Sequence, residues 1–440
     1  MSTTTTSAFT RRTFLGLVGA GAAVAGLAAC SSGGAGGAGA SGKPLKFWNM
    51  PDGGPAFLKL DKQIVAAYKP ADGLPKVTYQ QIPWAGFAQV FSSAIASHTG
   101  PAVSGGGGTQ AFQFAHQGAI AYADHLLESW KSNGLYDDFL PGVLETMKTD
   151  QGYVAVPYNL DCRVSWYNKT LMAKAGADNP TTWDEYKDVC AKLKKIGVYG
   201  FGLGAGAGNY TGGQVLTAFM INNGGGLFNA KQEPDCLTDA NVEAIEYVLE
   251  LVKNGYSDPA GPSYTSANVQ SQWKAGKFGF GWDTAGLAVS VGGDVANDMV
   301  VGDPLTSSSG KKGGLYFPNN LMMYKNTPSQ KGSEAFLTYY YKRMSPLWTH
   351  NTGIGLPVLK SIAATPQFKQ DANNVKVLNT WQPIYGTWAA PGGKGLFYNV
   401  ANTVDGTQPM VTFAQSILGG KTDAKSALTT LQNAIEGLMK

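Results

Sequence analysis

The sequence of 440 residues has no hydrophobic run long enough to cross a membrane. Its longest uncharged apolar stretch covers residues 14–29, which is 16 residues, whereas a transmembrane helix needs roughly 20. Glycine and alanine make this stretch only mildly apolar. A removed leader therefore fits it better than a membrane span, and an uncleaved anchor is the alternative.

Cysteine and histidine are both scarce, with four of each. The histidines, none of which shows metal-ligand spacing, are His98, His116, His125 and His350. The cysteines that follow residue 30 are Cys162, Cys190 and Cys236. Outside the cytoplasm this odd count allows at most one disulfide, and the spacing does not reveal which pair would form it. We expect no metal site and no cofactor.

Motifs of nucleophilic and nucleotide chemistry are missing as well. The sequence contains no Gly-x-Ser-x-Gly, the turn that presents the nucleophile of many hydrolases. The stretch LGGKT at residues 418–422 imitates the end of a phosphate-binding loop, but residue 415, where its first glycine would stand, is Gln. Pairs of catalytic carboxylates cannot be recognised from sequence alone. We expect a chain that neither binds ATP nor acts as an enzyme.

The chain also lacks a strong charge imbalance. Its formal net charge is +4 and falls to +2 without residues 1–29, which hold two arginines and no acidic residue. Because no basic block is present either, nucleic acid is an unsuitable partner. About 400 residues follow residue 42, more than one ordinary hydrophobic core holds, so we expect two lobes.

The first apolar stretch has the order of a secretory signal: a basic start, a short apolar middle and small residues before Cys30. Residues 10–15, TRRTFL, resemble a twin-arginine export signal, and residues 27–30, LAAC, resemble a bacterial lipobox. The resemblance implies a signal peptide at residues 1–29 and a lipidated Cys30, followed to residue 43 by a flexible tether. The mature chain would then sit outside the cytoplasm, anchored to the outer face of the bacterial membrane.

Strand and helix patterns alternate after the tether. We expect strands at PLKFWNM, KVTYQQIPW and PAVSGGGG, and helices at AFLKLDKQIVAAYK, FAQVFSSAIASH and LLESWKSNGL, an order that predicts a parallel sheet flanked by helices. Two long extended segments follow, one through Pro157 and one in GLYFPNNLMMYKN. Thr182 and Glu185 predict a capping box at the start of a helix.

Several of these segments together resemble the extracellular solute-binding proteins of ABC importers, in the carbohydrate-binding group that includes maltose-binding protein. The segments that carry the resemblance are GYVAVPYNLDCRVSWYNKTLMAKAGADNPTTWDEY, QSQWKAGKFGFGWDTAG and ILGGKTDAKSALTTLQNAI. One departure is that Pro101 is followed by Ala102, where the family usually has Asp, and that the next stretch, SGGGGTQAF, lacks the aromatic residue often found there.

The resemblance implies an α/β fold of the type II periplasmic-binding class, with two discontinuous lobes, a hinge and a cleft between them. We expect the first lobe to contain residues 44–160 and 315–365, and the second to contain residues 161–314 and 366–440. The implied partners are a carbohydrate ligand and the permease subunits of an importer, and we expect a monomer.

Sugar binding needs aromatic rings for the C–H faces of the ring and polar side chains for its hydroxyls. The candidates at the exit of the first strand are Trp48, Asn49 and Asp52, where Trp48 could equally belong to the core and Asp52 to a turn. Asp161 and Arg163 lie at the expected crossing between lobes, with an ion pair of structural role as the alternative. Ligands of open α/β sheets bind beyond the carboxyl ends of strands, which favours such positions.

The remaining candidates follow later strands and loops. Trp282, which matches the stacking tryptophan of the family, is the strongest of them, with a core position as its alternative. The others are Thr109, Gln110, Asn209, Tyr210, Asp283, Asn320 and Trp388. The expected activity is capture of a carbohydrate or polyol without chemical change, and a lipid-anchored carbohydrate-active hydrolase is the alternative.

Overall fold

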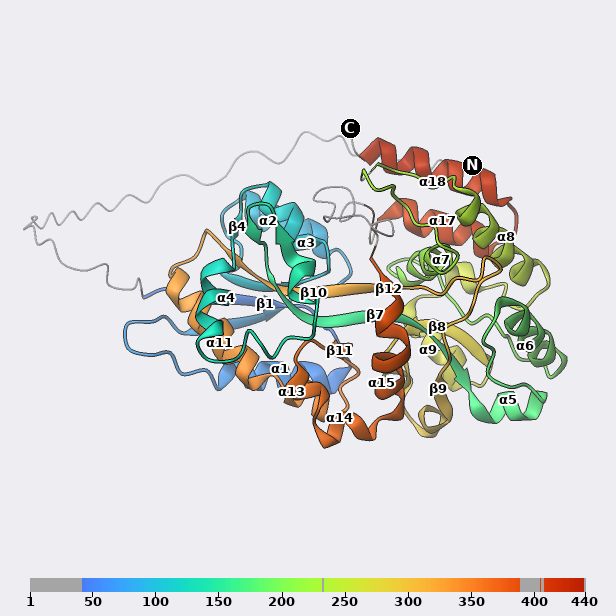
Figure 1. The fold of residues 1–440 in the computed structure, drawn as a ribbon, viewed down its shortest axis with the longest axis horizontal. Coiled ribbons are helices and arrows are strands. Elements are labelled where there is room, and N and C mark those ends of the chain that lie inside the picture. The colour runs from blue at the N-terminus through green and yellow to red at the C-terminus, as the bar shows by residue number, and fades with distance from the viewer. Residues whose placement is uncertain (1–41, 232, 388–403, 405–406, 439–440) are drawn as a thin grey trace, which may run out of the picture. The chain divides into compact units, whose positions relative to one another are not determined.

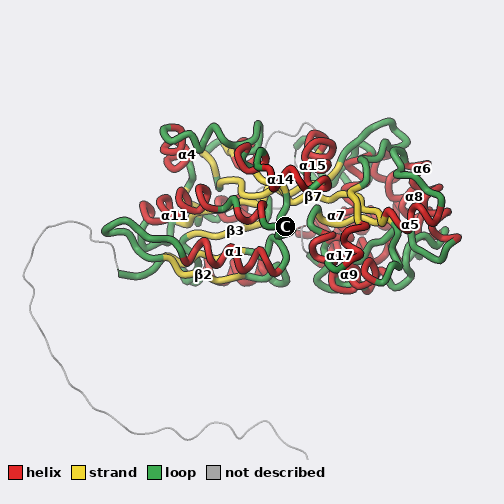
Figure 2. The backbone as a smooth tube through the Cα atoms, turned by 90° about the horizontal axis from the view of Figure 1, so that it is seen from below, coloured by secondary structure: helices red, strands yellow, loops and turns green. Residues whose placement is uncertain are grey.

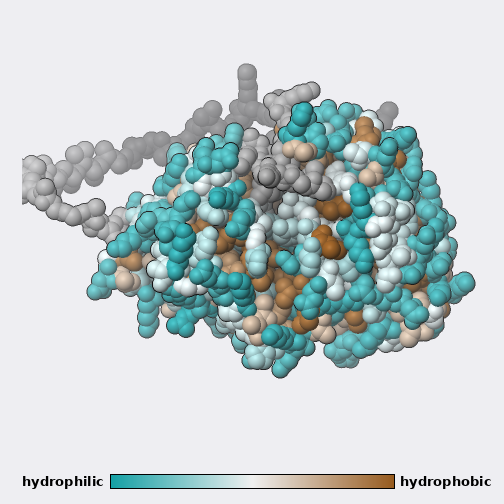
Figure 3. Space-filling model, in the orientation of Figure 1, coloured by the Kyte–Doolittle hydropathy of each residue, from teal (hydrophilic) through white to brown (hydrophobic). Residues whose placement is uncertain are grey.

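The computed structural model describes residues 42–231, 233–387, 404 and 407–438, which form two α/β lobes (Figure 1). The expected signal peptide, Cys30 and most of the tether, as well as Trp388, lie outside the described residues. Helices flank the strands in both lobes (Figure 2). Hydrophilic residues cover most of the face drawn in Figure 3, and hydrophobic ones gather toward its middle.

A mixed sheet with the strand order β11-β7-β10-β3-β1-β2 forms the first lobe. Its strands are β1 (Leu45–Asn49), β2 (Val77–Gln81), β3 (Val103–Gly106), β7 (Val156–Asn168), β10 (Gly314–Tyr324) and β11 (Leu356–Pro357), with β4 (Ile120–Ala121) beside β10. The β1, β2 and β3 strands are parallel, as expected. The sheet is not parallel throughout, because β10 runs antiparallel to both β3 and β7.

Amphipathic helices cover this sheet. They are α1 (Pro55–Ala66), α2 (Phe87–Ala96), α3 (Gln110–His116), α4 (Asp124–Lys131), α11 (Gln330–Arg343), α12 (Pro346–Thr349) and α13 (Lys360–Ala363). Helix α14 (Pro366–Gln370) contacts α12 and α13 and begins the connection back to the second lobe. In α1 the buried residues Phe57, Ile64 and Val65 recur at helical spacing, so one face of the helix packs on the sheet. The strand pair β5 (Lys148–Thr149) and β6 (Gly152–Tyr153) lies apart from this sheet.

The second lobe begins where β7 changes partners. Up to Cys162 the strand pairs with β10, and from Arg163 onward it pairs with β8 (Phe280–Thr284) and then β9 (Met299–Val301). The helices of this lobe are α5 (Lys169–Ala175), α6 (Trp183–Lys195), α7 (Thr211–Asn222), α8 (Asp239–Lys253), α9 (Ser266–Lys274), α10 (Leu287–Val291), α17 (Gln408–Leu418) and α18 (Ala424–Leu438). A last connection runs through α15 (Ala372–Lys376) to β12 (Tyr385–Gly386), which pairs with the start of β10.

Two local differences from the sequence expectations have physical causes. Helix α7 was not expected, because apart from Thr211 every one of its residues is buried, so it shows no polar face. The start of α6 carries half of the expected capping box: Thr182 Oγ1 accepts from the Glu185 amide at 3.2 Å. The Glu185 carboxylate, however, accepts from the backbone and hydroxyl of Thr181, both at 2.7 Å.

Candidate functional site

A cavity of about 260 Å³ lies along the part of β7 and β10 where the two lobes meet. Both lobes contribute to its lining: the loop after β1 and the segment after β2 from the first lobe, and the start of α7 and the end of β8 from the second. Ligand pockets in proteins commonly measure about 300–1,000 Å³, so this cavity suits a small molecule.

Because side chains alternate between the two faces of a strand, the polar side chains of β7 that line the cavity share one face of the sheet. Asn159, Asp161 and Arg163 are alternate residues of β7 and therefore point to the same side of the sheet. Phe317 pairs with Asp161 and Asn319 pairs with Asn159 across the strands, and both of these β10 residues line the cavity. The pairing register shifts directly after Asn319, a β-bulge next to the site.

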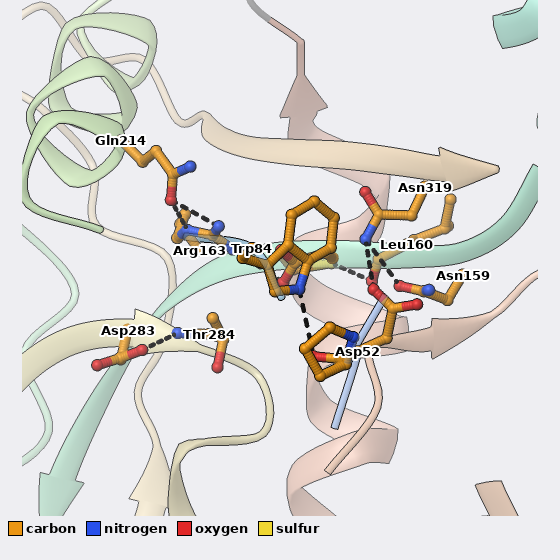
Figure 4. Close-up of polar contacts among 12 residues, drawn as sticks. Asp52, Trp84, Asn159, Leu160, Arg163, Gln214, Asp283, Thr284 and Asn319 are labelled. Carbon is orange, nitrogen blue, oxygen red and sulfur yellow. Dashed lines mark hydrogen bonds and ion pairs between the residues drawn. The ribbon is translucent and has the colours of Figure 1, made fainter. Parts of the chain in front are cut away.

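Arg163 is fixed from three directions. Its Nη1 donates to Asp161 Oδ1 at 2.8 Å, while Nε and Nη2 donate to Gln214 Oε1 of α7 at 2.8 Å and 2.6 Å (Figure 4). The guanidinium lies over the Phe317 ring, 5.0 Å from its centroid. The Arg163 side chain is only 5% exposed, whereas that of Asp161 is 27% exposed, so the acid presents its carboxylate to the cavity. Charge-assisted bonds of this kind hold Asp161 in one orientation.

Asp52 lies on the first-lobe side of the cavity, near two amides. Its Oδ1 accepts from Asn319 Nδ2 at 3.3 Å, and the same Asn319 nitrogen lies 3.5 Å from Asn159 Oδ1 (Figure 4). Burial and then the negative charges of Asp161 and Asp61 raise the pKa of Asp52 well above its usual 3.8, and the two amides offset this only in part.

Trp84 supplies an aromatic wall opposite these polar groups. It follows β2 by three residues, and its Nε1 donates to the Pro51 carbonyl at 3.2 Å, which fixes the half-buried ring. A Cβ added to Gly107 would meet this ring at 3.6 Å, so the ring lies against the backbone of the glycine turn. Phe87, Tyr210 and Phe317 are the other described aromatic residues of the lining.

Asp283 lies at the end of β8, and its carboxyl points away from Asp52 (Figure 4). It is not among the residues that line the cavity, so the geometry does not support its expected contact with a ligand. Its Oδ1 accepts from the Thr284 amide at 2.7 Å. Burial raises its pKa from 3.8 to about 6; Arg163 lowers this pKa and Asp161 raises it.

The raised pKa of Asp283 leads to a testable pH dependence. The folded state holds the proton more tightly than the unfolded state, so the stability of the wild type should fall as pH rises from about 4 to 6 and then level off. Asp283→Asn should lack this loss, which is at most about 3 kcal/mol. Urea unfolding of both proteins between pH 4 and 7 measures the difference, and parallel stability curves would contradict the prediction.

Two of the predicted tryptophans lie in the hydrophobic core in this structure. Trp282 is 4% exposed and packs in the core of the second lobe, 4.9 Å from the Phe219 ring and 5.8 Å from the Trp381 ring. Trp48 is 7% exposed and packs edge-on against Phe91 at 5.4 Å. Neither of them lines the cavity.

Five other predicted residues support the cavity from behind and do not line it: Asn49, Thr109, Gln110, Asn209 and Asn320. Asn49 donates to the buried Asp61 at 2.8 Å. Gln110 Oε1 accepts from the Gly107 amide at 3.3 Å, while Asn320 Nδ2 donates to the Gly107 carbonyl at 3.1 Å, so together they hold the glycine turn beneath Trp84. Asn209 bonds the Tyr264 carbonyl and the Thr211 amide at the start of α7, and Thr109 is buried at the start of α3.

Four of the predicted residues do line one cavity: Asp52, Asp161, Arg163 and Tyr210. Sequence reasoning missed Trp84, Asn159 and Gln214. The signals for the first two were present, because Trp84 stands at a strand exit and Asn159 is two residues before Asp161 on the same strand. Gln214 gave no signal, since it lies in the helix that the pattern did not reveal.

Cysteine and metal chemistry are absent from the described residues. Cys162, Cys190 and Cys236 are all buried and unpaired, so the single disulfide that the count allowed is not formed among them. Burial raises the pKa of each thiol, that of Cys236 to about 12. Within the described ranges no group of three metal-ligating side chains occurs, and no helix there has the length and hydrophobicity of a membrane span.

Comparisons with known proteins agree on one family. A profile described as bacterial extracellular solute-binding protein matches residues 55–343. The crystal structure of a sugar transporter from Arthrobacter chlorophenolicus A6, with bound laminaribiose, is 49% identical with a TM-score of 0.86, covering 90% of this chain and all of that one. A putative binding protein of Brucella abortus is 24% identical over 324 residues, which are 70% of this chain and 77% of the relative. Maltose-bound MalE3 of T. maritima shares the fold, with a TM-score of 0.73 at 18% identity over 90% of this chain and 99% of that one.

Proposed function

Because this chain belongs to the family of bacterial extracellular solute-binding proteins, we propose that it captures a carbohydrate outside the membrane for an ABC importer. The family resemblance and the two-lobed α/β fold expected from the sequence are both confirmed. The observation that carries the proposal is one cavity lined by the fixed Asp161–Arg163 pair, amides and the Trp84 ring.

The cavity has the two kinds of surface that a sugar requires. Asp52, Asp161 and Asn159 present acceptors and donors for hydroxyl groups, and charge-assisted bonds to Asp161 are the stronger kind. The indole of Trp84 offers a flat apolar face for the C–H groups of a pyranose ring. A disaccharide of glucose such as laminaribiose is the first ligand to test, since the relative that is 49% identical was crystallised with it.

We place the lobe boundaries where the sequence predicts them, with 44–160 and 315–365 in the first lobe and 161–314 and 366–440 in the second. The change of strand partners after Cys162 supports the first crossing. The bonds of Asn373 to Met299 and Val301 support the return to the second lobe after residue 365. Ligand that contacts both lobes favours the closed arrangement by its differential affinity for it, and the permease would bind that form.

Anchoring and assembly complete the proposal. Residues 1–29 act as a twin-arginine signal peptide, and the lipid on Cys30 holds the mature monomer at the outer face of the cell membrane. The motif TRRTFL, the motif LAAC and the glycine-rich tether support this arrangement.

The chain binds its sugar without hydrolysing it. Its relatives with described ligands are binding proteins of transport systems, which favours capture over the hydrolase alternative. The test is calorimetry of the chain against a panel of mono- and disaccharides, with chromatography of the sugar after long incubation. Saturable binding with an intact sugar is expected; absence of binding to every saccharide, or progressive cleavage, would refute the proposal.

Trp84→Ala should weaken laminaribiose binding roughly 10- to 100-fold, which is about 1.4–2.8 kcal/mol. The expected cause is loss of the apolar face beneath the sugar ring. Isothermal titration calorimetry measures the affinity without relying on tryptophan fluorescence. The variant Trp84→Phe, which keeps an aromatic face, should recover most of the wild-type affinity. If Trp84→Ala binds as tightly as the wild type, Trp84 does not contact the ligand.

A further inference from the structure

We infer that the cavity selects neutral saccharides and rejects acidic ones, because Asp161 and Gln214 occupy the guanidinium that an acidic sugar would need. This inference rests on the proposed function and narrows it to one class of sugar.

The single cation among the described lining residues is Arg163. Three of its five N–H groups donate to Asp161 Oδ1 at 2.8 Å and to Gln214 Oε1 at 2.8 Å and 2.6 Å. Phe317 covers one face of the guanidinium plane, and the side chain is 5% exposed. A carboxylate on a ligand would therefore compete with Asp161 and Gln214 for a guanidinium that is almost fully buried.

The surroundings of Asp52 indicate the sign of the local potential. This carboxyl lies in the same cavity, and burial together with the charge of Asp161 disfavours its ionised form despite the amides of Asn319 and Asn159. A carboxylate carried by a ligand would meet the same lack of solvent and the same repulsion. The cavity is thus unsuited to a further negative charge.

Neutral hydroxyl groups match the remaining polar atoms. Asn159 lines the cavity and is only 1% exposed. Its amide is near enough to Asp52 to lower the pKa of that carboxyl, but its Nδ2 makes no hydrogen bond of normal geometry within the described part of the chain. This donor needs an acceptor, while the partly exposed oxygens of Asp161 need donors. A hydroxyl group is both donor and acceptor, so one sugar can satisfy both residues without adding charge.

The experiment is calorimetric titration of the full chain with laminaribiose and with its uronic acid counterpart, in which one primary alcohol is oxidised to a carboxylate. We expect the acidic disaccharide to bind at least 100-fold more weakly at pH 7. The difference should shrink as salt is added, because part of it comes from repulsion between charges.

Two variants separate the availability of Arg163 from the net charge. Asp161→Asn removes a negative charge but keeps an Oδ1 that can accept from Nη1, whereas Gln214→Ala removes the acceptor of Nε and Nη2 without changing the charge. Each variant should reduce the ratio of the dissociation constants of the acidic and the neutral disaccharide at least 10-fold. Asp298→Asn is the matched control: it removes a carboxylate from an exposed pair with Lys169, outside the cavity lining, and should leave this ratio unchanged.

The outcomes distinguish this inference from the proposed function. The inference is overturned if the wild type binds both disaccharides equally well, or if both variants keep the wild-type difference in affinity between the two disaccharides. Either result leaves the proposed carbohydrate capture intact. Absence of binding to either sugar overturns both. Circular dichroism checks the fold of each variant, and if one of them does not fold, the other and the wild-type comparison decide.

Discussion

Arg163→Ala should reduce the affinity for laminaribiose at least about 100-fold, which corresponds to about 2.8 kcal/mol. The substitution leaves Asp161 and Gln214 without the donors that orient them, and it removes the group that packs on Phe317. Truncating one partner of a buried, hydrogen-bonded charge pair commonly costs about 2–5 kcal/mol, much of it from the partner left behind. The free energy of unfolding should fall by about 2–3 kcal/mol for the same reason.

Arg163→Lys is the control for this prediction. Lysine keeps the charge, but its single ammonium cannot reproduce the planar fork that reaches Asp161 and Gln214 together, so only part of the affinity should return. Calorimetry gives the affinity and urea unfolding gives the stability. If Arg163→Ala leaves both the affinity and the stability unchanged, the bonds of Arg163 to Asp161 and Gln214 do not hold the cavity residues in place.

Trp282→Ala should destabilise the protein by about 3–5 kcal/mol, as expected for the loss of a buried tryptophan. The indole contacts Phe219 and Trp381 and is 4% exposed, so its removal leaves a void that the packed core closes only in part. Protein that remains folded should bind laminaribiose with nearly wild-type affinity. Guanidinium unfolding with calorimetry at low temperature tests both statements.

Comparing Trp282→Ala with Trp84→Ala distinguishes a tryptophan of the core from one that contacts the ligand. Trp84→Ala should change affinity more than stability, and Trp282→Ala should do the reverse. If Trp282→Ala instead weakened binding with little loss of stability, the stacking role expected from the sequence would be correct and the core position would not explain the residue.

Much of the fold followed from sequence because its elements are amphipathic. The strand around Tyr79 and the helix around Ile64 are half-buried, and half-burial produces the periodicity that a pattern search detects. Helix α7 is buried on nearly all sides, so its sequence carries no periodic polar face to mark it. The reversed direction of β10 was also invisible, because strand direction depends on distant pairing.

The site was predictable where burial and charge conflict. Asp161 and Arg163 stand out as charged residues in an apolar strand, and the structure places both at the cavity. The sequence does not show which way a tryptophan within or after a strand points: Trp84, which follows β2, lines the cavity, whereas Trp282, which lies within β8, packs in the core. Only the packing of neighbours such as Phe219 decides between these two positions.

The three unpaired, buried thiols bear on where this protein can mature. Cys162, Cys190 and Cys236 form no disulfide with one another, and their raised pKa values keep the thiols protonated and unreactive. The described fold can therefore be completed in a reducing environment, and later exposure to oxygen would neither strengthen it nor scramble it.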